Sequence, residues 1–139
     1  MAITTYEDIM AIKSILDTDS YLNKLGFVPE NIYRKNISSE EVTKETMGIY
    51  IYASAPDGAV KGLASRQVIT INIIAEESKV ASVMNASQQC IALLHETDIG
   101  NNHRLETRYP PLTLNAPKEV FSQEVAFILE TSIYTPIKT

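Results

Sequence analysis

Three segments of this chain alternate aliphatic and polar side chains with a period of two, which limits the possible folds more than any other feature. One begins at Gly48, one is centred on Ile71, and one runs from Val120 to Tyr134. In each, one set of alternate positions is mainly aliphatic and the other carries mostly Tyr, Thr, Asn, Glu or Ser. Successive side chains of a strand point to opposite faces. We therefore predict strands with one face in a core and the other facing water or a partner.

Other segments have helical spacing. We predict helices over 6–16 and 21–25, the second capped by Ser20 and ended by Gly26 as a left-handed residue. The clearest helix is expected over 79–95, capped by Ser78. Its predicted buried stripe is Val80, Val83, Met84, Ile91 and Leu94, with Ser87 as a small residue inside it.

The order of these elements predicts the fold class. The first two strands form a hairpin around residues 55–66, where Asp57-Gly58 supplies turn chemistry. A loop is expected over 98–103, a short strand over 104–108, and a proline-rich extended connection over 110–117. The last strand follows and is expected to contain a bulge. The sequence predicts an α+β fold, a mostly antiparallel sheet of about four strands with helices packed on one face.

Length and composition indicate one domain over 1–139, since 45% of the 139 residues are hydrophobic and 21% are charged. Residues 31–46 are polar and weakly periodic. We predict that they form a mobile arm and that 55–66 form a mobile loop.

A net charge of −5 opposes a broad electrostatic grip on nucleic acid or an anionic membrane. The first residues lack a basic region followed by an apolar one, so we expect no secretory signal and a reducing compartment. The apolar runs are too short for a membrane span.

The sequence favours a non-enzyme. It has no phosphate-binding loop, no dinucleotide fingerprint, no nucleophile elbow and no zinc-protease motif, so we expect no cofactor, metal or catalytic residue. Cys90 and His95 lie about 140° apart around one helix, using ~100° per residue, and cannot act as nucleophile and base there. Cys90 is interpreted as packing material.

Residues 48–135 resemble the tail terminator, or tail completion, proteins of long-tailed bacteriophages. The segments that carry the resemblance are VITINIIAEES, VASVMNASQQCIALLHE, NNHRLETRYPPLTLN and VFSQEVAFILETSIYT. Element order and hydrophobic pattern match over about two thirds of the chain, together with the size and the opening helix, while 31–46 have no counterpart.

The resemblance implies a virion protein that assembles in the host cytoplasm as a homo-hexameric ring on the tail tube. Such a ring stops tube polymerisation and meets the connector proteins of the head, and DNA passes through it without being bound. On that interpretation Glu124 and Glu130 line the lumen, and a ring of six carries about −30, which keeps DNA from adhering.

The remaining candidate positions are predicted to form the ring or partner interface. Several Tyr on one sheet face suggest contact with a partner. The interface candidates are Tyr50, Tyr52, Asp57, Lys61, Arg66, Arg104, Arg108 and Tyr109. The alternative is a small ligand-binding module or an oligomeric metabolic enzyme with an interface site, which requires a pocket around Arg66, Arg104, Arg108 and Tyr109.

Overall fold

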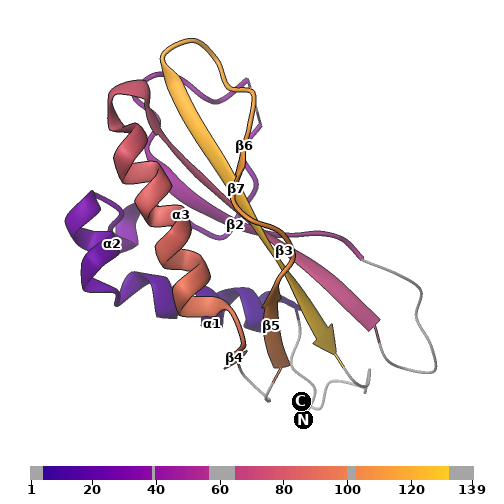
Figure 1. Cartoon of the computed structure of the whole chain (residues 1–139). Coiled ribbons are helices and arrows are strands. Elements are labelled where there is room, and N and C mark those ends of the chain that lie inside the picture. Colours follow the sequence, from indigo (N-terminus) through magenta and orange to yellow (C-terminus); the bar gives the residue numbers. More distant parts are fainter. Residues whose placement is uncertain (1–4, 39, 57–64, 100–102, 132–139) are drawn as a thin grey trace.

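The computed structural model describes residues 5–38, 40–56, 65–99 and 103–131. Their helices are α1 (Thr5–Asp17), α2 (Ser20–Leu25) and α3 (Val80–Leu94), with 3-10 turns at Pro29–Asn31 and Glu77–Lys79. The strands are β1 (Ile32–Tyr33), β2 (Gly48–Pro56), β3 (Ser65–Glu76), β4 (Thr97–Ile99), β5 (His103–Thr107), β6 (Leu112–Thr113) and β7 (Val120–Thr131). Figure 1 shows α3 lying along the sheet with α1 crossing near its end.

One sheet contains all seven strands described, in the order β1-β2-β3-β7-β5-β4, with β6 paired to β7. Every pair is antiparallel except β1–β2. The α+β fold is confirmed, and the four predicted strands correspond to β2, β3, β5 and β7. The pairing of β3 with β7 runs from Ser65↔Thr131 to Glu76↔Val120 without a register shift, so the predicted bulge in β7 is absent from this pairing. A shift occurs instead in β2, between Ala53 and Pro56.

The core lies between the helices and the aliphatic face of the sheet. Alternation along β2, β3 and β7 turns every second residue toward the helices, where burial of its apolar surface stabilises the fold. The fully buried contributors include Ile12, Leu16, Leu22, Ile49, Ile51, Ile69, Ile71, Ile73, Val83, Cys90, Leu94, Val125, Phe127 and Leu129. Helices therefore cover one face, as predicted.

The predicted stripe of α3 is partly wrong. Val83, Ser87 and Leu94 are buried as predicted. However, Met84 is 43% exposed, and Val80 and Ile91 are half-buried. The buried positions are Val83, Ala86, Ser87, Cys90 and Leu94, so the core-facing side is centred on small residues. Small side chains let the helix approach the sheet closely, which hydropathy alone does not indicate.

Two predicted helix caps are also corrected. Asp19, not Ser20, precedes α2, and its carboxylate accepts a hydrogen bond from Leu22 N–H at 2.9 Å. A 3-10 turn precedes α3 and its cap residue is Lys79, without a side-chain cap bond, so Ser78 does not cap it. Gly26 ends α2 with φ 103°, in the left-handed region as predicted.

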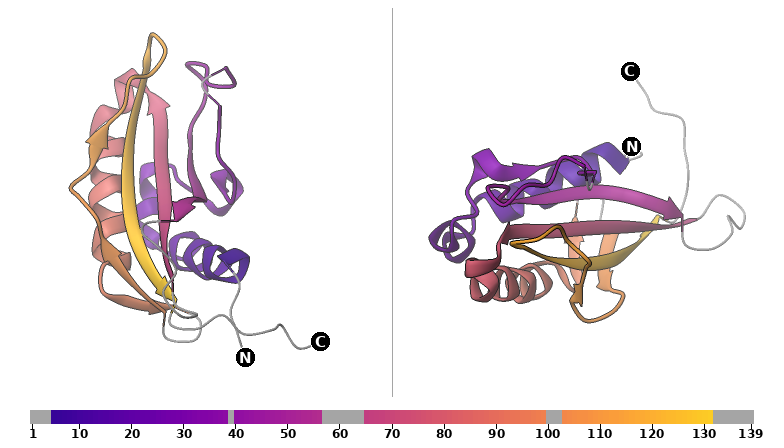
Figure 2. Two further views of the ribbon diagram at one scale, coloured as in Figure 1. Left: turned by 90° about the vertical axis from the view of Figure 1, so that its right-hand side faces the viewer. Right: turned by 90° about the horizontal axis from the view of Figure 1, so that it is seen from above.

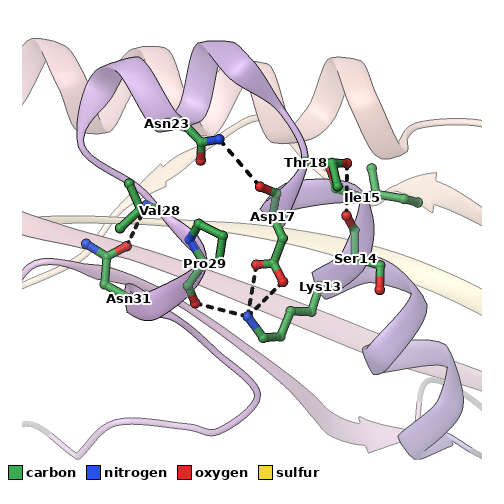
Figure 3. Close-up of polar contacts among 9 residues, drawn as sticks. All are labelled: Lys13, Ser14, Ile15, Asp17, Thr18, Asn23, Val28, Pro29 and Asn31. Atoms are coloured by element: carbon green, nitrogen blue, oxygen red, sulfur yellow. Dashed lines mark hydrogen bonds and ion pairs between the residues drawn. The ribbon is translucent and has the colours of Figure 1, made fainter.

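A network of polar contacts fixes the corner between α1 and the start of β1 (Figure 3). Lys13 Nζ bridges the Asp17 carboxylate at 2.9 Å and the Pro29 carbonyl at 3.1 Å. The Asn31 side chain accepts from Val28 N–H at 2.9 Å. These bonds place β1 beside β2, where a Cβ on Gly48 would lie 2.7 Å from the Asn31 carbonyl oxygen. Only glycine tolerates this approach.

The predicted loop over 98–103 contains part of two strands. Asp98 and Ile99 belong to β4, and His103 begins β5. The segment 31–46 also contributes β1, and its Tyr33, Ile37 and Val42 side chains pack against the sheet. The left view of Figure 2 shows the chain that follows β1 running beside the sheet. The mobility of 31–46 stays a prediction, and 57–64 of the predicted mobile loop lie outside the described residues.

Candidate functional site

The face of the sheet turned away from the helices is the candidate site. Alternation places Tyr50 and Tyr52 of β2 on it, beside Thr70 and Asn72 of β3 and Ser122 and Glu124 of β7. We call this the polar face. Thr70, Asn72 and Ser122 are buried in the middle of the sheet, whereas Tyr52 and Glu124 are half-buried. The predicted two-faced character of these strands is therefore present.

One end of the polar face is covered by side chains from the segments that follow β1 and β6. The Tyr33 and Tyr50 rings stack with centroids 4.8 Å apart. Tyr50, Ile74 and Val120 form a second apolar cluster, against which Tyr33, Ile37, Val42 and Ala116 pack. Tyr50 is only 6% exposed as a result. It lies on the predicted face but does not offer an open aromatic surface in the single chain.

A polar cluster lies beside this covered end. Tyr109 O–H donates a hydrogen bond to Glu124 Oε2, and Asn72 Nδ2 donates to Tyr52 Oη at 3.4 Å. The negative charge of Glu124 also acts on Tyr52. Glu124 thus lies on the polar face as predicted, but it is held by Tyr109 rather than free in solvent.

The cluster raises the pKa of both tyrosines. Burial is the main cause for Tyr109, followed by its bond to Glu124, and together they raise its pKa to about 12. For Tyr52 burial again comes first and the Glu124 charge second. In both cases the phenolate is disfavoured because it would be desolvated beside a carboxylate. The tyrosines therefore donate or accept hydrogen bonds as neutral phenols and do not serve as bases at neutral pH.

We expect the free energy of unfolding of Tyr109→Phe to fall less above pH 10 than that of the unaltered chain. A folded-state pKa above the ordinary value of 10 means that Tyr109 contributes stability below pH 10, which is lost as pH rises toward 12. Urea unfolding of both proteins between pH 8 and pH 11.5 measures this. The variant should be less stable at pH 8 by about 1 kcal/mol for the lost bond, and the gap should narrow above pH 10. Parallel curves would contradict the assignment.

Two of the predicted arginines lie in β5 or directly after it. Arg104 is exposed on β5, and its Nε lies 3.4 Å from Asp98 Oδ1 of β4. Arg108 follows β5 with its guanidinium 6.0 Å from the Tyr109 ring centre. A surface ion pair of this length contributes little stability. These two residues remain candidates for the ring or partner interface.

The structure describes the remaining predicted site residues only in part or not at all. Glu130 and Arg66 are directly opposite each other in the β3–β7 ladder. Asp57 and Lys61 lie outside the described residues. The lumen role of Glu130 and the interface roles of these three residues stay predictions.

Two hollows of the described surface lie away from the positions that the ligand-pocket alternative names. One cleft of about 120 Å³ lies on the covered end of the polar face, and an open hollow of about 380 Å³ is lined by Lys44, Glu76, Glu77, Ser78 and Glu119. Neither is lined by Arg104, Arg108 or Tyr109. The first is smaller than most small-molecule sites, which occupy roughly 300–1,000 Å³.

Metal-binding groups do not gather in the described part of the chain, where no three His, Cys, Asp or Glu side chains could hold an ion. None of its helices has the length and hydropathy needed to cross a bilayer.

Cys90 is fully buried in α3, and burial raises the pKa of its thiol to about 12, with a smaller contribution from Asp19. A thiol of this kind is unreactive. We expect Cys90→Ala to retain the fold and any assembly activity, at a cost of about 1 kcal/mol for one lost group of methyl size. Thermal melting and ring assembly check this. A variant that folds normally but fails to assemble would show that the thiol itself is needed.

Two features of the polar face were not predicted from the sequence: the buried Asn72 and the cover provided by 114–117. Asn72 is 8% exposed, and its Oδ1 has no hydrogen-bond partner among the residues that the structure describes. The one indication in the sequence was that Asn72 occupies a polar position of a predicted strand. The cover depends on the path of the proline-rich connection, and this path cannot be predicted from a periodic pattern of side chains.

Comparisons with known proteins show the fold. No family model matches the chain, and no curated protein matches its sequence. A solved chain described as "Virion of native gene transfer agent (GTA) particle" matches with a TM-score of 0.68 at 13% identity, covering 95% of this chain and 99% of that one. Another solved structure matches with a TM-score of 0.59 at 11% identity, covering 97% of this chain and 100% of that one. This chain therefore has the same fold as a chain from a gene transfer agent virion.

Proposed function

We propose that this chain is a structural virion protein that forms a ring at the head-proximal end of a phage tail tube. The ring ends tube polymerisation and joins the tail to the head connector. The observation that carries the proposal is the fold match to a gene transfer agent virion chain, which extends over 95% of this chain and 99% of that one. A gene transfer agent particle is phage-like, so a structural role in a virion is the function that this fold supports best.

The polar face suits the lining of a conduit. It carries neutral phenols, amides and hydroxyls with Glu124 among them. The groups of this face between Tyr50 and Tyr52, Thr70 and Asn72, and Ser122 and Glu124 are neutral or acidic, so this part of the face gives the phosphate backbone no cation to bind. The net charge of −5 adds repulsion from the subunit as a whole. DNA would pass such a face without being held.

The partners follow from this role. Copies of the chain meet one another in a homo-hexamer, one rim of the ring meets the tail tube protein, and the other meets the head connector proteins. Neither a cofactor nor catalysis enters the proposal, because the work of the protein is to present surfaces.

Native mass spectrometry and electron microscopy test this function. We expect the purified chain to form a hexameric ring, alone or when it is added to purified tail tubes. A stable trimer whose melting temperature rises with a small-molecule ligand would support the ligand-binding alternative instead.

A further inference from the structure

The side chain of His95 holds the end of β5 through one hydrogen bond. Thr107, the last residue of β5, donates its backbone N–H to His95 Nδ1 at 3.0 Å. A ring nitrogen of histidine accepts a hydrogen bond only when it carries no proton. The contact therefore requires a neutral His95 with its proton on Nε2, and that nitrogen lies 3.8 Å from Glu96 Oε1.

The register of the sheet explains why a side chain makes this bond. β4 pairs antiparallel with β5 as far as Thr97↔Leu105. Two further residues in the same register would bring His95 opposite Thr107. Instead, Glu96 adopts a left-handed φ of 58°, and His95 is the C-cap of α3. The imidazole thus takes the place of the strand partner that β4 does not provide.

The two edges of β5 differ in the kind of acceptor that they meet. Successive N–H groups of a strand point to opposite edges, so Thr107 and Arg108 donate in opposite directions. Arg108 N–H donates to the Ala126 carbonyl of β7 at 2.9 Å. A carbonyl accepts at any pH, whereas an imidazole nitrogen accepts only while it is unprotonated. The bond on the outer edge is therefore the acid-sensitive one.

We propose that the contact between His95 and Thr107 is an acid-sensitive latch on the outer edge of β5. At neutral pH the imidazole accepts the Thr107 N–H. In acid both ring nitrogens carry protons, so the latch opens and the N–H loses its partner. Arg104 lies on this strand and Arg108 follows it, and both are predicted for the ring or partner interface. Acid thus alters a candidate contact surface while the pairing of β5 with β7 remains.

The charged groups around His95 determine what a pH change reports. α3 itself carries no charged residue, and Asp98 pairs with Arg104 across β4 and β5 with 3.4 Å between Oδ1 and Nε. Among these residue types only histidine ordinarily changes its charge between about pH 5 and pH 8. The other charged residues on or next to elements that contact β4 or β5 are Glu7, Asp8, Lys13 and Asp17 of α1, Glu96, Glu106, Arg108, and Glu124 and Glu130 of β7.

Amide hydrogen exchange followed by NMR tests the latch. The quantity measured is the protection factor, by which the fold slows exchange relative to an unstructured chain at the same pH. We expect the protection factor of Thr107 N–H to fall about tenfold between pH 7.5 and pH 5, the effect of losing one hydrogen bond. Arg108 N–H is the internal control, and its protection factor should stay constant because its acceptor is a carbonyl.

Three variants identify the titrating group. His95→Asn keeps an acceptor, because its Oδ1 is as many bonds from Cα as Nδ1 of histidine and does not titrate. It should protect Thr107 N–H equally at both pH values. His95→Phe has no acceptor and should give low protection at both. His103→Asn replaces the other histidine of the chain and should leave the pH dependence of Thr107 unchanged.

Several results would overturn the latch. Equal protection of Thr107 at both pH values in the unaltered chain is one, and a pH dependence that persists in His95→Asn is another. Imidazole nitrogen shifts that place the proton on Nδ1 at pH 7.5 would also exclude it. Loss of protection at Thr107 and Arg108 together would show general unfolding instead. Ring formation enters none of these measurements, so their failure leaves the proposed function standing.

Discussion

Val83→Asp is expected to unfold the protein, because it places a carboxylate on the fully buried side of α3, in the first turn of a helix that packs against β3 and β7. An unpaired charge in an apolar site costs several kcal/mol, which is comparable to the whole stability of a small domain. Circular dichroism melting of the purified variant measures the effect. We expect no cooperative transition near that of the unaltered chain.

Met84→Asp is the matched control, one residue further along the same helix. Met84 is 43% exposed, so its replacement should change stability by only about 0.5–1 kcal/mol. If both variants melted like the unaltered chain, α3 would not contribute its Val83 face to the core. If both unfolded, an effect on the helix itself would be responsible rather than burial.

Charge reversal on the polar face should impair the passage of DNA. Glu124→Lys with Glu130→Lys changes the charge by about +4 per copy, or about +24 in a ring of six, so the lumen would attract phosphate instead of repelling it. We expect tails of normal length and slowed DNA release, most strongly at low salt, where screening is weakest. Electron microscopy gives the tail length, and nuclease digestion of released DNA gives the rate.

Two controls isolate the charge effect from the structural one. Glu124 accepts a hydrogen bond from Tyr109, so its replacement by Lys costs about 1–2 kcal/mol, whereas Glu124→Gln keeps an acceptor without the charge. Glu30→Lys with Glu96→Lys makes the same charge change at two exposed positions in turns beside the helices. Normal release from the lumen variant at every salt concentration would exclude the lumen assignment. Overlong tails would place these glutamates at the surface that binds the tube.

The elements that could be predicted from the sequence are those with a clear periodic pattern of their own. β2, β3 and β7 each bury one face, so strict alternation identifies them, and α3 is long enough for its spacing to be read. β1, β4 and β6 have two or three residues each and exist only because a neighbouring strand pairs with them. A two-residue strand has no period, and tertiary pairing alone defines it.

The sequence predicts which face of the sheet carries the candidate site, but it does not predict the contacts between the side chains there. Alternation alone places Glu124 opposite the helices. Its bond to Tyr109 depends on how the chain between β5 and β6 turns, fifteen residues away in sequence. Tyr50 shows the same limit, because its burial requires Tyr33 of a segment that looked irregular.

Tail length in the absence of this protein is the most direct test of its proposed role. Particles are assembled with and without the chain, and tube lengths are measured by electron microscopy. A terminator predicts overlong, headless tubes without the chain and a return to one uniform length when the purified protein is added during assembly. Tubes of unchanged uniform length, joined normally to heads in its absence, would contradict the account.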